Sequence, residues 1–70
     1  MDYDVIDRVK GYTLDAGDTI IYDGNVWEIR PGVVDDTDPN ILMFPAHNLD
    51  TGDEDEIPVE PEDYYELVSQ

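Results

Sequence analysis

Carboxylates dominate the side chains in this sequence that are capable of chemistry. Its 70 residues contain 19 Asp and Glu against 3 Lys and Arg, one histidine (His47) and no cysteine. A nucleophilic serine needs a base held against it, and the only serine, Ser69, is the penultimate residue. Paired carboxylates can act as acid and base, but among this many acids such pairs arise by chance. We therefore expect no enzymatic activity.

Metal and cofactor sites are not expected either. The acidic runs at 35–38 and 53–56 offer oxygen ligands, but neither has the alternating spacing, with glycine at the sixth position, of a calcium loop. His47 has no second histidine or cysteine with which to share a metal ion, so it is predicted to be a surface or strand-end residue. The glycines are dispersed and Lys10 is the only lysine, which disfavours a phosphate-binding loop.

Length and charge restrict the class of protein. A chain of 70 residues buries only about 60% of the surface of its unfolded form, so we expect one small domain with a thin stability margin. Within this domain, residues 1–13 are predicted to be an N-terminal strand or arm and residues 14–68 the core. No signal peptide and no apolar run near about 18 residues is evident, which favours a cytoplasmic protein. The net charge of -16 disfavours direct binding to nucleic acids or anionic membranes and favours basic partners.

Residues 19–22 and 25–30 are predicted to form a β-hairpin. Both runs are rich in β-branched and aromatic residues, and the Asp-Gly pair at 23–24 is typical of a type I′ turn. A two-residue turn sets the register, with Tyr22 opposite Asn25. The face that we expect to enter the core carries Ile20, Tyr22, Trp27 and Ile29.

Further short strands follow the hairpin. Residues 41–44 form an apolar run that we expect to stop or bulge at Pro45 and to resume as far as residue 49. Residues 54–59 are predicted to be an edge strand, because Pro58 would remove a hydrogen bond inside a sheet. A last strand is predicted at 66–68.

The connections are expected to be turns and loops. Residues 33–40 are predicted to be a polar loop, and Gly52 to be a left-handed turn residue. Residues 61–65 begin with proline followed by acids, which favours a single helical turn before the last strand. Of the adjacent Tyr64 and Tyr65, Tyr64 is expected to support the core.

Five or six short strands in a chain of this length favour a mainly β, strongly curved barrel. The Asp-Gly turn at 23–24 followed by Trp27, a strand through Phe44, a glycine turn and the closing Pro-x-x-Tyr-x-x-Leu at 61–67 make a recognisable pattern. In these features the chain resembles the Src-homology-3 and Tudor-like class of small barrels. In composition it is similar to small acidic bacteriophage proteins.

The aromatic residues allow two interpretations. Trp27 lies on the heavier apolar face of the hairpin, which favours a role as a core anchor. The Tudor resemblance implies instead a cage that holds methylated arginine or lysine by cation–π attraction. The residues of this alternative site are Tyr22, Trp27, Phe44 and Tyr65.

The negative charge is concentrated in the second half of the chain. Residues 36–70 contain 11 acids and no lysine or arginine, whereas residues 1–35 contain 8 acids and all 3 bases. The candidate partner-binding acids are Asp36, Asp38, Asp50, Asp53, Glu54, Asp55, Glu56, Glu60, Glu62 and Asp63.

These charges favour a non-enzymatic interaction module whose acidic face binds a basic protein. The most specific version is a phage-type nucleic-acid mimic that regulates a DNA- or RNA-binding protein in the host-cell cytoplasm, without a cofactor. The alternatives are a structural accessory subunit, for example of a virion, and a reader of methylated arginine or lysine. A solvated acidic face that only maintains solubility, or that reflects a salt-loving source, also accounts for the composition.

Overall fold

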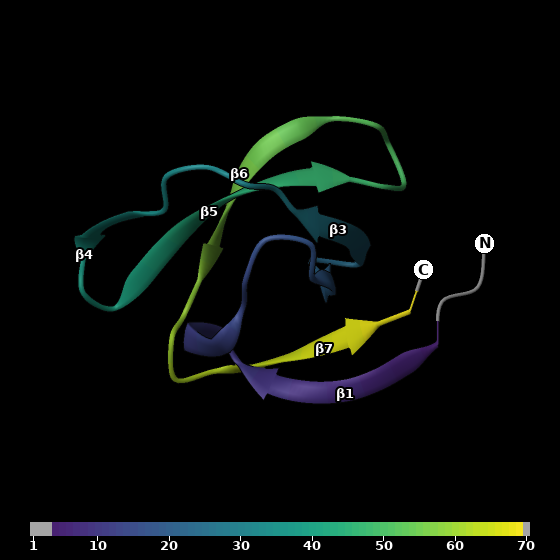
Figure 1. The fold of residues 1–70 in the computed structure, drawn as a ribbon, viewed down its shortest axis with the longest axis horizontal. Coiled ribbons are helices and arrows are strands. Elements are labelled where there is room, and N and C mark those ends of the chain that lie inside the picture. The colour runs from purple at the N-terminus through teal and green to yellow at the C-terminus, as the bar shows by residue number, and fades with distance from the viewer. Residues whose placement is uncertain (1–3, 70) are drawn as a thin grey trace.

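The computed structural model describes residues 4–69, apart from the side chains of residues 36 and 37. Within that range the chain forms seven β-strands and one short 3-10 helix (Figure 1), which confirms the prediction of a mainly β protein. The elements in chain order are β1 (Val5–Lys10), η1 (Gly11–Thr13), β2 (Thr19–Tyr22), β3 (Asn25–Ile29), β4 (Asp35–Asp38), β5 (Ile41–Asn48), β6 (Glu54–Val59) and β7 (Tyr64–Val68).

The strands form one antiparallel sheet in the order β1-β7-β2-β3-β5, with β4 and β6 also paired to β5. β5 has three partner strands, because β3 and then β4 pair along one side of it while β6 pairs along the other. Between residues 4 and 69 no ladder joins β6 to β1, so the sheet curves but is not closed into a barrel. As predicted, β6 is an edge strand.

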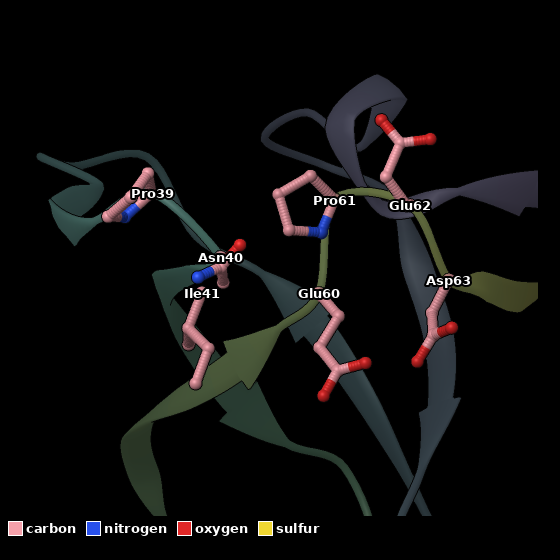
Figure 2. Close-up of a pocket in the computed structure, with 7 residues that line it drawn as sticks. All are labelled: Pro39, Asn40, Ile41, Glu60, Pro61, Glu62 and Asp63. Atoms are coloured by element: carbon pink, nitrogen blue, oxygen red, sulfur yellow. The ribbon is translucent and has the colours of Figure 1, made fainter.

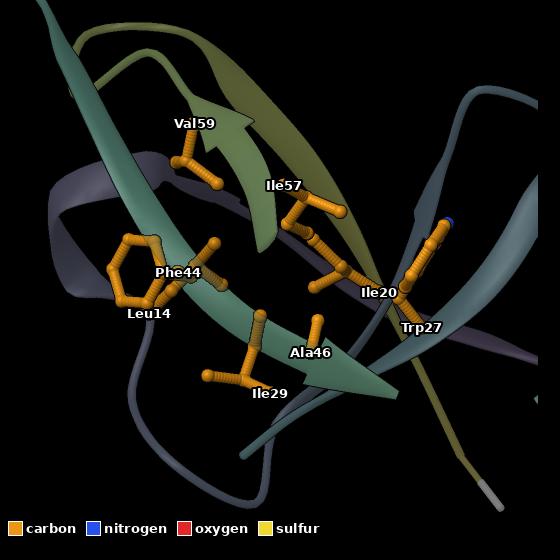
Figure 3. Close-up of a cluster of buried hydrophobic side chains, with 8 residues drawn as sticks. All are labelled: Leu14, Ile20, Trp27, Ile29, Phe44, Ala46, Ile57 and Val59. Atoms are coloured by element: carbon orange, nitrogen blue, oxygen red, sulfur yellow. The ribbon is translucent and has the colours of Figure 1, made fainter. Parts of the chain in front are cut away.

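The first hairpin has the predicted register. Asp23 and Gly24 have φ of 51° and 78°, as a type I′ turn requires. Tyr22 is opposite Asn25 and Ile20 is opposite Trp27. The expected face of this hairpin enters the core, where the buried cluster (Figure 3) consists of Leu14, Ile20, Trp27, Ile29, Phe44, Ala46, Ile57 and Val59.

Pro45 lies inside β5 without stopping or bulging it, so that prediction was wrong. The carbonyl of Pro45 accepts the N–H of Arg30 at 2.9 Å, which directs its backbone polar groups toward the β3 side. On that side β3 ends at Ile29, and β4 pairs with β5 only as far as Met43, so neither strand is paired with Pro45. The missing N–H of proline therefore removes no ladder hydrogen bond, and β5 continues to Asn48.

Part of the predicted polar loop at 33–40 is the short strand β4. Asp35 is opposite Met43 and Asp38 is opposite Ile41. The first half of β5 has a free side after β3 ends, and the returning chain pairs with it there. A polar composition alone did not indicate this pairing.

The 3-10 helix lies before β2 and not before the last strand, where the sequence predicted a helical turn. The β6–β7 connection is a β-turn in which the Asp63 N–H donates to the Glu60 carbonyl at 3.1 Å. The N–H groups of Gly11 and Tyr12 donate to the carbonyls of Asp63 and Pro61, at 2.9 and 3.2 Å. Because these two carbonyls already accept hydrogen bonds, they are not available to a helical turn. β7 begins at Tyr64, directly after the β-turn and before the predicted start at residue 66.

Candidate interaction surface

The predicted partner-binding acids whose side chains are described all lie at the surface. They are Asp38, Asp50, Asp53, Glu54, Asp55, Glu56, Glu60, Glu62 and Asp63. The side chain of Asp36 lies outside the described part of the chain. Most of these acids gather at the two ends of β6, which are about 17 Å apart for a strand of this length.

The first group, which we call the acidic edge, consists of Asp53, Glu54, Asp55 and Glu56, where the chain enters β6. Glu54 and Glu56 point to one face of the sheet, about 7 Å apart along the strand. The Asp55 carboxylate accepts the N–H of Glu56 at 2.8 Å. Because this N–H belongs to the free side of an edge strand, the carboxylate covers a donor that a further strand would otherwise use.

The turn before the acidic edge is held by Asn48. Its buried side-chain carbonyl accepts the N–H groups of Asp50 and Thr51, at 2.8 and 3.1 Å. Gly52 has a φ of 84°, as predicted for a left-handed residue. Its N–H donates to the backbone carbonyl of Asn48 at 2.7 Å. The Asp50 carboxylate accepts the N–H of Val26 at 2.8 Å. Asp50 therefore ties the turn to β3, and its carboxylate has a structural role.

The second group surrounds an open groove of about 380 Å³ between the β4–β5 and β6–β7 turns (Figure 2). Its lining residues are Pro39, Asn40, Ile41, Glu60, Pro61, Glu62 and Asp63. The carboxylates of Glu60 and Asp63 extend in the same direction, whereas that of Glu62 points the opposite way (Figure 2). Glu62 forms an ion pair with Lys10 at 3.3 Å.

Glu60 and Asp63 repel each other when both are ionised. A hydrogen bond and the negative charge of Asp63 raise the pKa of Glu60 above its usual value. Glu60 is therefore more often protonated in the folded protein than in the unfolded chain. The Glu60–Asp63 pair accordingly stabilises the folded state at low pH. Its contribution is lost as the pH rises through the pKa that Glu60 has in the folded state.

We expect Glu60→Gln to raise the midpoint of thermal unfolding at pH 7, because it removes this repulsion. The advantage over the unmodified protein should shrink between pH 7 and pH 4, where Glu60 becomes protonated. Thermal unfolding followed by circular dichroism at both pH values measures this difference in the midpoint. Glu56→Gln removes the same charge from the edge of β6 and is the control. An equal, pH-independent gain in both variants would contradict the coupling of Glu60 to Asp63.

The outer face of β3, β5 and β6 carries a mixed charge cluster around Glu54. Arg30 lies 3.2 Å from Glu28 and 3.8 Å from Glu54, and the His47 Nδ1 atom lies 2.9 Å from a Glu54 oxygen. His47 is half-buried and lies next to the last residue of β5, which agrees with the strand-end part of the prediction. In the described part of the chain, no group of three or more His, Asp or Glu side chains is arranged to hold a metal ion.

The other two basic residues lie together on β1, at the opposite end of the sheet. The Arg8 guanidinium is 5.5 Å from the centre of the Tyr64 ring, and Lys10 Nζ is 5.9 Å from the rings of Tyr12 and Tyr64. Glu62 raises the pKa of Lys10 through their ion pair. We call Arg8 and Lys10 the basic edge. Sequence reasoning missed it, although the alternation of Arg8 and Lys10 places both on one face of an extended chain.

The aromatic residues of the alternative site face the core. Trp27 and Phe44 are buried, and the indole N–H donates to the Tyr22 carbonyl at 3.2 Å. Tyr65 is half-buried, and its hydroxyl oxygen accepts the N–H of Glu60 at 2.8 Å. Tyr64 is 56% exposed, so the prediction that it supports the core was wrong: the strand register directs Tyr65 inward and Tyr64 outward.

No protein-family profile matches this chain, and neither does any curated protein sequence. Across residues 4–69, no helix has the length and apolar character needed to span a membrane. The residues and their arrangement are therefore the basis for inferring what the protein does.

Proposed function

We propose that this chain is a non-catalytic interaction module that binds a basic protein through the acidic edge and the groove at the other end of β6. The observation that carries the proposal is the concentration of exposed carboxylates at the start of β6, where the neighbouring basic side chains in the described part of the chain are Arg30 and His47. Glu54, Asp55 and Glu56 project as exposed side chains from one edge strand, while Arg8 and Lys10 lie at the opposite end of the sheet. Such a surface attracts a basic partner over a distance and orients it on approach.

Two local features reduce the number of backbone donors that this edge offers, so a basic partner would meet its side chains first. Asp55 already occupies the free N–H of Glu56, and Pro58 offers no N–H at all. Asn48 and Gly52 hold the preceding turn, so the carboxylates have a defined spacing on a rigid strand. Fixed, regularly spaced negative groups are also what a nucleic-acid backbone presents to its binding proteins.

The most specific form of the proposal is therefore a nucleic-acid mimic that occupies the binding surface of a DNA- or RNA-binding protein. Small size, high negative charge and a small, curved antiparallel sheet are consistent with a phage-encoded regulator that acts in the host cytoplasm. This form requires no catalytic residue and no cofactor.

Retention of basic proteins from a lysate of the source cells tests the proposal. We expect the immobilised chain to retain a basic nucleic-acid-binding protein at about 50 mM salt and to release it by about 300 mM, because phosphate-like contacts weaken steeply with salt. The variant Asp55→Lys/Glu56→Lys should lose at least tenfold in retention. A nucleic-acid oligomer should compete for the same retained protein.

The matched control is Asp4→Lys/Glu66→Lys, which makes the same change in net charge on exposed residues at the β1–β7 end. It should retain the partner nearly as well as the unmodified chain. An equal loss in both variants would show that total acidity, and not the acidic edge, is responsible. Retention that resists salt would favour the structural-subunit alternative. Circular dichroism confirms that each variant is folded.

A further inference from the structure

The two opposite ends of the sheet are complementary to each other. β1 pairs only with β7, and β6 pairs only with β5, among the described residues, so each strand has one free side. β1 lies at the bottom of Figure 1 and the start of β6 at the top. One free side carries Arg8 and Lys10, and the other carries Glu54 and Glu56. We propose that β1 of one copy pairs with β6 of the next, so that the chain assembles head to tail.

The direction of the backbone groups supports this pairing. The Arg8 N–H is bonded to the Asp7 carboxylate at 2.7 Å, and the Glu56 N–H to the Asp55 carboxylate at 2.8 Å. In an antiparallel ladder the polar groups of alternate residues point to opposite sides of a strand. Since Arg8 and Glu56 are capped by side chains, their N–H groups point to the free sides, and so do those of Lys10 and Glu54, two residues away.

The faces also match. Residues opposite each other stay on the same face of a sheet, so the register can be followed from end to end. Across β6, β5, β3 and β2 the outer face runs through Glu54, His47, Glu28 and Thr19, each opposite the next. The pair Ile20–Leu67 carries the register to β7, whose outer-face residues Glu66 and Tyr64 lie opposite Arg8 and Lys10. An antiparallel junction with Lys10 opposite Glu54 and Arg8 opposite Glu56 therefore joins outer face to outer face. The same register places the Lys10 N–H opposite the Glu54 carbonyl, while the Lys10 carbonyl, which already accepts the Thr13 hydroxyl at 2.7 Å, would have to accept the Glu54 N–H as well.

The junction is limited in length and strength. Gly11 lies against Val59 and Glu60, which covers the far end of β6, and Pro58 contributes no N–H. The carboxylates of Asp7 and Asp55 must leave the N–H groups of Arg8 and Glu56 before these groups can pair with another copy. This cost weakens the junction, so it forms only at a high protein concentration. At physiological salt the Debye length is about 8 Å, so the remaining negative charges repel only weakly across the junction. The contact joins two different surfaces, and such contacts produce open chains or rings.

Sedimentation equilibrium of the purified protein tests the assembly without any other partner. Between about 50 µM and 1 mM in 0.15 M NaCl, the mass of the unmodified chain should rise from 8.0 kDa to at least twice that value. The variants Arg8→Glu/Lys10→Glu and Glu54→Lys/Glu56→Lys should each stay monomeric, because each places like charges on both sides of the junction. Circular dichroism confirms that both are folded.

An equimolar mixture of the two variants provides the decisive measurement. The reversed β1 of one variant then meets the reversed β6 of the other, and association should return to the level of the unmodified chain. Both variants remain strongly negative, so a general attraction between them cannot produce this gain. Three results would overturn the proposal: a monomer up to 1 mM, undiminished association of either variant alone, or a mixture that associates no better than its components. None of these results bears on the binding of a basic partner.

Discussion

Gly11→Ala is expected to remove most of the stability of this protein. A Cβ atom at this position would lie 2.4 Å from the Glu60 carbonyl oxygen and 2.6 Å from a methyl carbon of Val59. The Glu60 contact is with backbone, which can move only if the β6–β7 turn moves. The Gly11 N–H also donates to the Asp63 carbonyl at 2.9 Å, so displacement of the chain breaks a hydrogen bond that joins η1 to this turn.

The expected loss is about 3 kcal/mol, which combines overpacking with a weakened hydrogen bond. A domain of this size has a free energy of unfolding of about 5 kcal/mol, so Gly11→Ala should leave a marginally folded protein. Urea denaturation followed by the fluorescence of Trp27, which is buried in the core, measures the change.

Gly17→Ala is the matched control. Gly17 has φ of 94° and no atom within 4 Å of the position that a Cβ would occupy. Only the positive φ is unfavourable there, at a cost of about 1 kcal/mol. If Gly11→Ala destabilised the protein no more than Gly17→Ala, the close approach between Gly11 and the β6–β7 turn would be contradicted.

The parts of the fold that were predictable depend on residues close together in the sequence. The Asp-Gly turn at 23–24 sets the register of its hairpin, and alternation within each strand then identifies the buried face. Pro58 similarly predicted that β6 is an edge strand. In each case the local chemistry permits only one arrangement.

The errors arose where a distant segment decides the structure. Pro45 is tolerated because β3 ends and β4 has not begun beside it, which the sequence around Pro45 does not reveal. The helical turn predicted at 61–65 is absent because Gly11 and Tyr12 take the carbonyls that it needs. The hydrogen bonds of Gly11 and Tyr12 join parts of the chain about fifty residues apart in the sequence, and Pro45 contacts Arg30, about fifteen residues away.

For the candidate surface, sequence reasoning identified the acids and their exposure but not their arrangement. Composition alone predicts that such residues face solvent. That Glu54 and Glu56 stand at one end of the sheet, with Arg8 and Lys10 at the other, follows from the strand order. The strand order depends on β7 inserting between β1 and β2, a non-local pairing.

Asn48→Ala is the second substitution from which we expect a large effect. Asn48 is 4% exposed, and its side-chain carbonyl accepts the N–H groups of Asp50 and Thr51. Alanine leaves both donors without this acceptor in a partly buried turn, at a cost of about 2 kcal/mol. Thr51→Ala removes an exposed hydroxyl whose hydrogen bonds with Asp53, at 3.1 and 3.3 Å, are open to solvent, and it should cost under about 0.5 kcal/mol. Urea denaturation compares the two variants.

Amide hydrogen exchange separates a local effect from general destabilisation. In Asn48→Ala the amides of Asp50 and Thr51 should exchange faster than the lowered global stability accounts for, because their own acceptor is lost. Amides of the β2–β3 hairpin should change only as the global stability does. Uniform acceleration would contradict a role for Asn48 in holding the turn.

Asn48→Ala also tests whether binding of the basic partner depends on the number of acids or on their placement. Asn48→Ala leaves every carboxylate in the chain, and therefore the net charge, unchanged. If the basic partner recognises carboxylates at defined positions, the loosened turn should weaken binding several-fold, because the turn has to be ordered again in the complex. Binding is measured under conditions in which the variant is fully folded. Equal affinity would mean that charge density alone attracts the partner, since only the geometry of the acidic edge differs between the two proteins.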